Sequence, residues 1–333
     1  MSNFCPDNRI VLAPLAGGPS TPELAAAVSE AGGLGFLGAG YLSAEALQAE
    51  IRRTRALTAH PIGVNLFVLT PVPVDTGAIA RYALELAAEA ERLGVELGEP
   101  RFDDDIYADK LDVLLAERVE VVSFTFGCPA PEVVRRLQAQ GLEAWVTVTS
   151  PEEARAAAAV DADVLVAQGA EAGGHRGAWT DADSEDAPLL RLLREITIAV
   201  DSPVVATGGI ADRTDVVAAL DAGAQAVQVG TSFLLCPEAG TNDAHRDAIL
   251  RGGGTTSFTR AFTGRRGRGI ENGFMRAHPG APSAYPHVHH LTAPPRAAAR
   301  AAGDPDSFNL WAGTSFRRAR AVPAHEVVAA LTV

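Results

Sequence analysis

Cysteine is scarce in this sequence of 333 residues, which contains only Cys5, Cys128 and Cys236. The three are odd in number and far apart, a pattern that fits neither a disulfide framework nor a structural zinc site. Small proteins of oxidising compartments are usually rich in cysteine. The scarcity therefore favours a reducing compartment, and we expect a cytoplasmic protein.

Basic charge and long apolar runs are also lacking. The chain has 28 Lys and Arg against 41 Asp and Glu, which gives a formal net charge of −13. Such acidity leaves no electrostatic footprint for nucleic acid or for an anionic membrane surface, and we expect neither partner. The apolar runs are short, so no transmembrane helix is predicted. The first nine residues lack a basic region followed by an apolar stretch, so no signal peptide is expected.

Hydrophobic residues, in contrast, make up 47% of the chain, which is enough for a large core. Up to about residue 235, short apolar runs alternate with Ala-rich helical stretches. The runs are almost continuously apolar, as strands buried on both faces of a parallel sheet should be. The eight predicted strands are 10–15, 34–38, 62–67, 119–126, 143–148, 163–169, 203–209 and 226–232.

Helix start and stop signals separate these runs. Thr21, Ser43 and Ser150 are each followed by Pro or a small residue and then an acid, which is the pattern of a capped first turn. Eight strand–helix units in series predict an α/β fold, a (β/α)8 TIM barrel, which needs about 250 residues. A doubly wound sheet, the alternative, would usually have fewer strands and a reversal in strand order.

The excess length lies mainly after the eighth strand, where the pattern changes to Gly, Pro, His and Arg. We predict a barrel over residues 1–237, a smaller lid over 238–323 inserted after strand eight, and a closing helix over 324–333 packed on the barrel. A second enlarged connection, 70–107, joins strands three and four. Short helices within the lid are predicted at 244–250 and 295–302.

Glycines and polar residues follow the ends of the predicted strands, which is where TIM barrels bind their ligands. The strongest signal is a pair of loops after strands seven and eight, with Gly208 and Gly209 in one and Gly230 and Thr231 in the other. Their backbone N–H groups are poorly covered by side chains, so the paired loops suit a phosphate group. Simple tight turns are the alternative interpretation of these glycines.

His175 lies in a glycine-flanked segment, EAGGHRG, which we expect to be a loop at the same face. Histidine titrates near neutral pH and can take a proton or stabilise an anion. On chemistry alone, a functional role and a structural or solvated histidine stay equally open. Gly33, Gly35 and Gly38 match G-x-G-x-x-G, but a helix precedes them and a strand lies inside the match, so no dinucleotide site is expected.

Three other groups of reactive residues are interpreted as structural. His287, His289 and His290 lack acidic or Cys partners at ligand spacing, so they indicate a lid surface or pocket edge rather than a metal site. Cys128 has no evident base or cation beside it and is interpreted as a packed small residue rather than a reactive thiol. The run Asp103 to Asp105 is interpreted as solvated surface.

Several stretches occur in a fixed order along the chain, among them PIGVNLF, VSFTFGCP, VAQGAEAGGHRG, VVATGGIAD followed by QVGTSFL, AFTGRRGRGIENGFM and HHLTAPPRAAAR. Together they resemble the nitronate monooxygenase family, formerly called 2-nitropropane dioxygenases. The resemblance covers nearly the whole chain and implies an FMN-bound barrel without a metal, in which His175 matches the catalytic histidine. Together with the strand-end positions it gives the candidate cofactor-binding residues Ala16, Gly17, Asn65, Gln168, Gly173, Gly174, Gly208, Gly209, Gln228, Val229, Gly230 and Thr231.

The reaction implied by the resemblance is FMN-dependent oxidation of an alkyl nitronate, such as propionate 3-nitronate, by O2 to a carbonyl compound and nitrite. The partners are then the nitronate and O2, the role is detoxification, and a homodimer is an open expectation. The alternative is an FMN-dependent NAD(P)H reductase of an enoyl thioester or quinone, because one barrel hosts many chemistries. A third class is a flavin- or phosphate-binding protein without activity. The resemblance is weakest over 70–107 and around residues 315–317; in the latter stretch we expect an aromatic or cationic pocket residue.

Overall fold

The computed structural model describes residues 5–182 and 186–333. Residues 1–4, on which the prediction of no signal peptide partly depends, lie outside the described residues. Eight parallel strands form one sheet in the order β1-β9-β8-β6-β5-β4-β3-β2. A parallel bridge between Val11 and Leu34 joins the two ends of this order, so the sheet closes on itself. The prediction of a (β/α)8 TIM barrel is confirmed.

The barrel strands follow the predicted apolar runs. They are β1 (Ile10–Leu12), β2 (Gly35–Gly38), β3 (Ile62–Phe67), β4 (Val121–Thr125), β5 (Glu143–Val148), β6 (Val164–Gln168), β8 (Val204–Thr207) and β9 (Ala226–Val229). Strands β3 and β5 are buried at every position, as expected for strands covered on both faces. Strand β1 is shorter than predicted, because Ala13 to Ala16 leave the sheet and line the cavity described below.

Helices surround this sheet. They are α1 (Pro22–Glu30), α2 (Ala44–Leu57), α4 (Tyr107–Glu117), α5 (Pro131–Gln138), α6 (Pro151–Ala159), α7 (Leu189–Ala199), α8 (Arg213–Asp221) and α12 (Ala324–Leu331). Thr21, Ser43 and Ser150 each accept a hydrogen bond from the backbone N–H three residues on, so the predicted N-caps are confirmed. Helix α12 packs between α1 and α8 and completes the ring.

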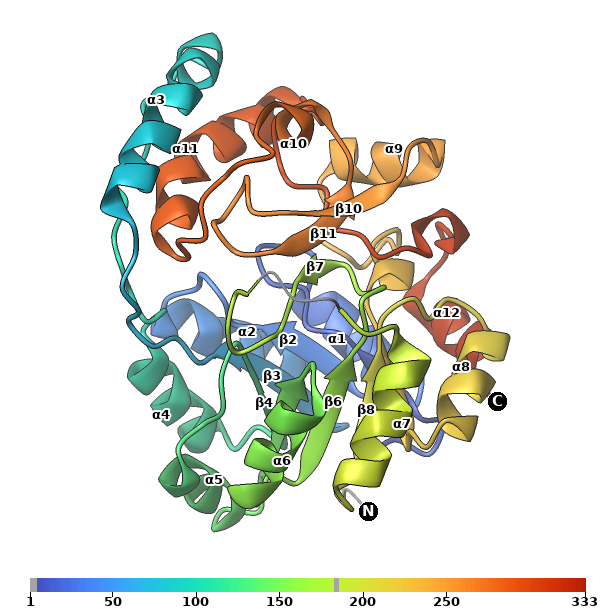
Figure 1. Ribbon diagram of the computed structural model, residues 1–333. Helices are drawn as coiled ribbons and strands as arrows, with labels where there is room; N and C mark the ends of the chain where they lie inside the picture. Colours follow the sequence, from blue (N-terminus) through green and yellow to red (C-terminus); the bar gives the residue numbers. More distant parts are fainter. Residues whose placement is uncertain (1–4, 183–185) are drawn as a thin grey trace.

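The lid stands above the barrel (Figure 1). It contains a three-stranded antiparallel sheet in the order β10-β11-β7, whose third strand comes from the barrel loop after β6. His175 therefore lies in a short strand, and the prediction of a loop there is wrong. The pairing joins residues 174–175 to 267–268, a sequence separation that no local pattern reveals. The elements in and next to the lid are β7 (Gly174–His175), η1 (Thr231–Phe233), α9 (Asp243–Arg251), β10 (Thr256–Thr259), β11 (Gly267–Ile270), α10 (Gly273–Ala277), α11 (His287–Ala302) and η2 (Phe316–Arg318).

The lid also takes part of its core from the enlarged connection between β3 and β4. Helix α3 (Thr76–Arg92) lies beside α11 (Figure 1). Its buried side chains Ile79, Tyr82 and Leu86 join one hydrophobic cluster with Phe262 and Val288 of the lid. The Tyr82 hydroxyl donates to the carbonyl oxygen of Ala261 at 2.6 Å. The domain boundaries at residues 237 and 323 stay predictions. Helix α3 lies before residue 237, within the range predicted for the barrel.

Helix α11 begins at His287, eight residues before the predicted start, although it contains Pro294 and Pro295. Proline has no N–H, so Pro295 leaves the carbonyl of Leu291 without its helical donor. The backbone N–H of Gly98 donates to that carbonyl instead, at 2.9 Å. A Cβ atom at Gly98 would lie 2.0 Å from the His290 carbonyl oxygen, so this approach requires glycine. A tertiary contact thus supports a helix that two prolines argue against locally.

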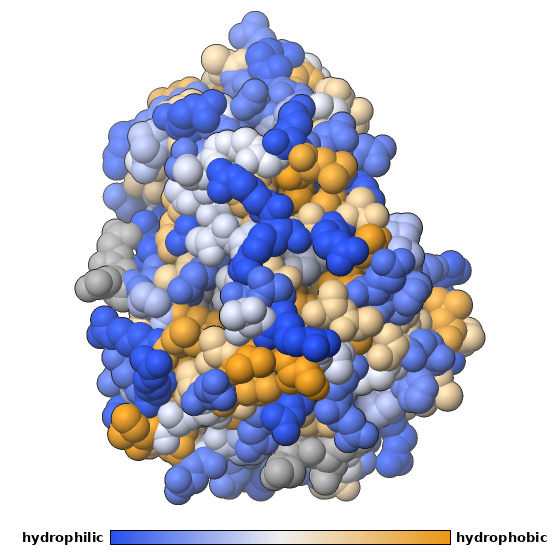
Figure 2. All heavy atoms as spheres, turned by 90° about the vertical axis from the view of Figure 1, so that its right-hand side faces the viewer, coloured by the Kyte–Doolittle hydropathy of each residue, from blue (hydrophilic) through white to orange (hydrophobic). Residues whose placement is uncertain are grey.

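The outer surface is mixed in character. Figure 2 shows one side of the molecule, on which apolar side chains form small groups separated by hydrophilic ones. Among the described residues, no helix combines the length and hydrophobicity that crossing a bilayer needs.

Candidate active site

A cavity of about 590 Å³ lies between the C-terminal ends of the barrel strands and the lid. This volume falls within the range of roughly 300–1,000 Å³ that is typical of cofactor and substrate sites. Every residue predicted from the sequence to bind cofactor or to act in catalysis lines this cavity. They are Ala16, Gly17, Asn65, Gln168, Gly173, Gly174, His175, Gly208, Gly209, Gln228, Val229, Gly230 and Thr231. The structure brings them together, and their roles stay predictions.

The paired glycine loops form one part of the cavity wall. Gly208 and Gly209 have φ values of 119° and 74°, in the left-handed region that favours glycine. Gly230 has φ −114°, which any residue can adopt. The nearby cation Arg318 is already engaged, because it donates to the Gly209 carbonyl and lies 2.7 Å from the Asp212 carboxylate. Backbone N–H groups therefore remain the best donors for an anion here, as predicted for a phosphate group.

The amide side chains of Asn65 and Gln168 lie in the cavity wall. Asn65 is buried, and its Nδ2 donates to Ser123 Oγ on the neighbouring strand at 2.9 Å. Gln168 Nε2 donates to the carbonyl oxygen of His175 at 3.1 Å, while its Oε1 accepts from the N–H of Gly177 at 2.7 Å. Gln168 thus fixes the backbone around His175, a role that the sequence alone does not reveal.

The imidazole of His175 faces the cavity from strand β7. Its Nε2 lies 2.9 Å from Thr263 Oγ1, and the Thr263 hydroxyl lies 3.3 Å from the carbonyl oxygen of Arg265. When the hydroxyl donates to that carbonyl, it accepts from Nε2–H, and Nδ1 is then the proton-accepting nitrogen. Burial, helped by the charges of Arg265 and Arg296, lowers the pKa of His175 to about 3. The ring is therefore neutral near pH 7.

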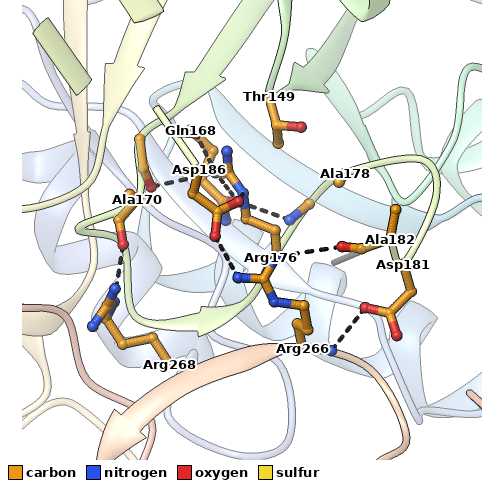
Figure 3. Close-up of polar contacts among 12 residues, drawn as sticks. Thr149, Gln168, Ala170, Arg176, Ala178, Asp181, Ala182, Asp186, Arg266 and Arg268 are labelled. Atoms are coloured by element: carbon orange, nitrogen blue, oxygen red, sulfur yellow. Dashed lines mark hydrogen bonds and ion pairs between the residues drawn. The ribbon is translucent and has the colours of Figure 1, made fainter. Parts of the chain in front are cut away.

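An ion-pair network ties the loop after β6 to the lid (Figure 3). Asp186 lies between two guanidinium groups, with Arg176 Nε at 2.8 Å and Arg266 Nη2 at 2.6 Å. Arg268 Nε donates to the carbonyl oxygen of Ala170 at 2.9 Å. Because the charges of Arg176, Arg266 and Asp186 are largely buried and paired, the network holds β7 against β11 in one register.

A wall of rings surrounds the histidine, and most of it was not predicted from the sequence. The ring centroids of Phe126, Tyr285 and Trp311 lie 5.7, 5.7 and 5.3 Å from that of His175. Tyr41 stacks on His289 with centroids 4.3 Å apart and planes 4° apart. These residues come from separate segments of barrel and lid, so no single motif marks them.

The prediction of a pocket residue at 315–317 needs correction. Ser315 lines the cavity, but Phe316 is buried in the lid core and Arg317 binds the carbonyl oxygen of Gly252 instead. The aromatic and cationic cavity residues come mainly from elsewhere, above all from α11, which supplies His289, Arg296 and Arg300. Of the predicted histidine cluster, His289 lines the cavity. Across residues 5–182 and 186–333, no group of three or more His, Cys, Asp or Glu is arranged to hold a metal.

The two remaining structural interpretations had different outcomes. Burial raises the pKa of the Cys128 thiol to about 11, which agrees with a packed, unreactive residue. Asp105, in contrast, is not solvated surface. It is mostly buried and lies 2.7 Å from Lys110 Nζ, and Lys110, which is fully buried, is the single lysine of the sequence.

This ion pair holds Tyr41 at the cavity. Lys110 Nζ donates to the carbonyl oxygen of Ala39 at 2.9 Å, and Asp105 Oδ1 accepts from the N–H of Tyr41 at 2.9 Å. Tyr41 has φ 72°, an unusual value for a residue with a side chain. The pair therefore secures a strained turn that carries a ring of the cavity wall.

Replacing Lys110 by methionine is expected to lower the free energy of unfolding by about 3–5 kcal/mol, because it leaves a buried carboxyl group without its cation. Urea unfolding measures this loss. Arg136→Met is the matched control, since Arg136 and its partner Asp112 are exposed and should contribute no more than about 1 kcal/mol. Equal, small losses in the two variants would show that the Lys110 pair does not secure the fold.

Stability is expected to fall as the pH drops below 6.5. Burial lowers the pKa values of His175, His245 and His289 to about 3, 4 and 2. Below pH 6.5 these histidines are protonated in the unfolded chain but stay neutral in the folded chain. The free energy of unfolding therefore has its full value above that pH and falls toward pH 4. Each histidine contributes up to about 1.4 kcal/mol per pH unit in that window.

Urea unfolding between pH 7 and 4.5 tests this dependence. His245→Gln removes one of the three histidines held neutral and should reduce the slope of stability against pH by up to about 1.4 kcal/mol per pH unit. A parental slope in His245→Gln would show that His245 is not held neutral.

Comparisons with known proteins decide the family. The family model described as "Nitronate monooxygenase" matches residues 1–333. The chain belongs to the nitronate monooxygenase family. A nitronate monooxygenase of Pseudomonas aeruginosa is 42% identical over 97% of this chain and 94% of its own, and one of Paraburkholderia phytofirmans is 39% identical over 98% and 91%. The chain is therefore an oxidoreductase of this family.

Solved structures agree with this membership in the nitronate monooxygenase family. A nitroalkane oxidase from Streptomyces ansochromogenes superposes with a TM-score of 0.95 at 49% identity, covering 98% of this chain and 95% of its own. FabK from Thermotoga maritima is more distant, with a TM-score of 0.78 at 26% identity and coverages of 98% and 92%.

Proposed function

We propose that this protein binds FMN in the cavity and uses O2 to oxidise alkyl nitronates to a carbonyl compound and nitrite. The observation that carries the proposal is the placement of His175 and the α11 arginines over a glycine-lined cavity. Family membership supports the same activity. The non-enzymatic alternative is not carried further, because the relatives named above are enzymes by name.

The residues present fit FMN. The loops at Gly208–Gly209 and Gly230–Thr231 offer backbone N–H groups to a phosphate, and the cavity volume is adequate for a flavin. When bound, FMN supplies the electron acceptor for the substrate and the electron donor for O2.

The protein's own side chains supply the rest. In the Nε2–H tautomer the neutral imidazole of His175 can accept a proton from a substrate carbon at Nδ1. In the other tautomer, in which the Thr263 hydroxyl donates to Nε2, Nδ1–H can donate one hydrogen bond to a nitro oxygen. The Arg296 guanidinium makes the electrostatic potential of the cavity favourable for an anion such as a nitronate. Phe126, Tyr285 and Trp311 exclude water around the reacting group.

The alternative is an FMN-dependent NAD(P)H reductase of an enoyl thioester or quinone. Its support is the likeness to FabK, which is weaker than the likeness to the nitroalkane oxidase.

Anaerobic mixing of the flavin-loaded protein separates the two functions. We expect the visible absorbance of the flavin to bleach on addition of a nitronate and to persist with NADH or NADPH. In air, the nitronate should yield nitrite and a carbonyl compound. Rapid bleaching by NADH or NADPH, with none by a nitronate, would establish the reductase instead.

A further inference from the structure

The buried hydroxyl of Thr263 lies where it can decide which ring nitrogen of His175 carries the proton. Thr263 is 1% exposed, and its Oγ1 lies 2.9 Å from His175 Nε2. A neutral imidazole has its proton on one nitrogen and a lone pair on the other. Among the described residues, no hydrogen-bonding group is paired with Nδ1, although the ring lines the cavity. Nδ1 is therefore the nitrogen left for a ligand.

The hydroxyl has two further neighbours, both on the backbone of Arg265. The Arg265 N–H donates to Thr263 Oγ1 at 3.4 Å, and Oγ1 lies 3.3 Å from the Arg265 carbonyl oxygen. A hydroxyl has one proton and two lone pairs. When it donates to this carbonyl, its lone pairs accept from the Arg265 N–H and from Nε2–H of His175, and every group has a partner.

The other tautomer leaves the Arg265 carbonyl oxygen unpaired. The hydroxyl would then donate to Nε2, and within the described part of the chain no other donor reaches that carbonyl. A buried carbonyl without a donor is costly, so the protein favours Nε2–H. Both contacts to Arg265 are long for hydrogen bonds, so the preference is a modest one.

The turn that carries this carbonyl is fixed against the segment after β7. The Arg265 guanidinium lies 4.1 Å from the centre of the Phe126 ring, and its Nε donates to the carbonyl oxygen of Arg176 at 3.3 Å. Gly264 has φ 77°, and a Cβ there would lie 2.8 Å from neighbouring backbone, so the turn requires glycine. His175 is held on the other side by the pairing of β7 with β11. The backbone therefore sets the distance between hydroxyl and ring.

We propose that Thr263 is a positioning residue that keeps the proton of His175 on Nε2, so that Nδ1 meets the substrate as a proton acceptor. The proposal rests on the proposed function, whose use of His175 it specifies. In the step that it supports, a C–H bond of a nitroalkane breaks and the proton passes to Nδ1. The electron pair stays on the carbon and nitro group, which gives the nitronate. Thr263 itself exchanges no proton with the substrate.

NMR of the 15N-labelled histidine rings measures the tautomer directly, without turnover. The flavin-loaded protein is used at pH 7, and His175→Asn identifies the signals of His175. We expect the parent protein to have a protonated Nε2 and an unprotonated Nδ1. In Thr263→Val, which removes the hydroxyl at similar volume, the ratio of tautomers should shift toward Nδ1–H by about 3–10-fold, the effect of one hydrogen bond. Thr263→Ser keeps a hydroxyl and should restore most of the Nε2–H form.

Steady-state O2 consumption gives a second readout. In Thr263→Val, kcat for a neutral nitroalkane should fall about 3–10-fold, because fewer molecules have a lone pair at Nδ1. The kcat for the matching nitronate, which needs no base, should change less. Thr197→Val is the matched control, since its hydroxyl donates to the Arg194 carbonyl oxygen at 3.2 Å on the exposed side of α7. We expect the control to leave the tautomer and both rates unchanged.

Three results would overturn the proposal. They are a parent protein with the proton on Nδ1, an unchanged tautomer in folded and flavin-loaded Thr263→Val, and equal changes in Thr263→Val and Thr263→Ser. The spectrum of the parent protein decides the tautomer even if the valine variant fails to fold. Failure of the parent protein to oxidise a nitronate would contradict the proposed function instead, and it would leave the NMR result as it stands.

Discussion

Replacing His175 by asparagine is expected to abolish nearly all turnover of neutral nitroalkanes while leaving substantial turnover of nitronates. A nitroalkane must lose a carbon-bound proton before it can give up an electron easily, whereas a nitronate has already lost it. The neutral, buried imidazole of His175 provides a proton acceptor in the cavity wall. Removal of a general base costs about 10²–10⁴ in rate. Steady-state O2 consumption with a nitroalkane and its nitronate measures the difference.

The outcome distinguishes two roles for the histidine. If His175 only binds the nitro group, turnover of the two substrates should fall by similar factors. The fall would correspond to about 1.5–3 kcal/mol, the contribution of one charge-assisted hydrogen bond. For an enzyme restricted to nitronates, binding of the anion is the expected role, and the neutral ring then acts by hydrogen bonding while Arg296 supplies the charge. Flavin content must be measured in the variant, because Gly173 and Gly174 of the same segment line the cavity. Unimpaired rates with both substrates would remove His175 from the mechanism.

Replacing Gly230 by valine is expected to yield mainly protein without flavin. A Cβ atom at Gly230 would lie 3.2 Å from Leu15 Cδ2 and 3.3 Å from Ala13 Cβ, both in the cavity wall, so a valine fills space beside the proposed phosphate site. The φ value of −114° lies outside the left-handed region that favours glycine. Absorbance of the purified protein gives the flavin content per chain.

Gly209 is a poorer position for this experiment. Its φ is 74°, and a Cβ there would lie 2.9 Å from the Glu171 side chain, so a substitution strains the fold before it affects a ligand. Gly253→Val is the matched control for Gly230→Val, since nothing lies within 4 Å of a Cβ at Gly253 and its φ is ordinary. We expect the control to hold a full complement of flavin. Full flavin content in folded Gly230→Val would show that the phosphate does not bind between the two loops.

Local patterns in the sequence were sufficient for the barrel. The eight apolar runs each contain a barrel strand, and the caps at Thr21, Ser43 and Ser150 form as predicted. Because the strands of a parallel barrel all end at the same face, the residues after each strand could be placed in one cavity before any contact was known. This is why His175 and the candidate cofactor residues converge as the sequence indicated.

The lid could not be derived in the same way. Its sheet pairs β7 with β11, almost a hundred residues away, and its core takes α3 from a connection that precedes it in the chain. Helix α11 crosses two prolines because Gly98 supplies a hydrogen-bond donor from outside the helix. The sequence predicts Asp105 at the solvated surface, whereas in the fold it pairs with the buried Lys110. Each of these depends on a partner that is distant in sequence.

The sequence by itself determined the barrel, the face that carries the cavity, the glycine loops and the candidate histidine, because strand periodicity, helix caps and strand ends are local properties. The tertiary structure alone decided what surrounds that histidine. It brought Tyr41, Phe126 and Trp311 to the cavity from different elements, and among the described residues it placed no carboxylate within ion-pair distance of Arg296 and Arg300. The charge balance of a buried site depends on every group packed around it, and so it can be assessed only once the chain is folded.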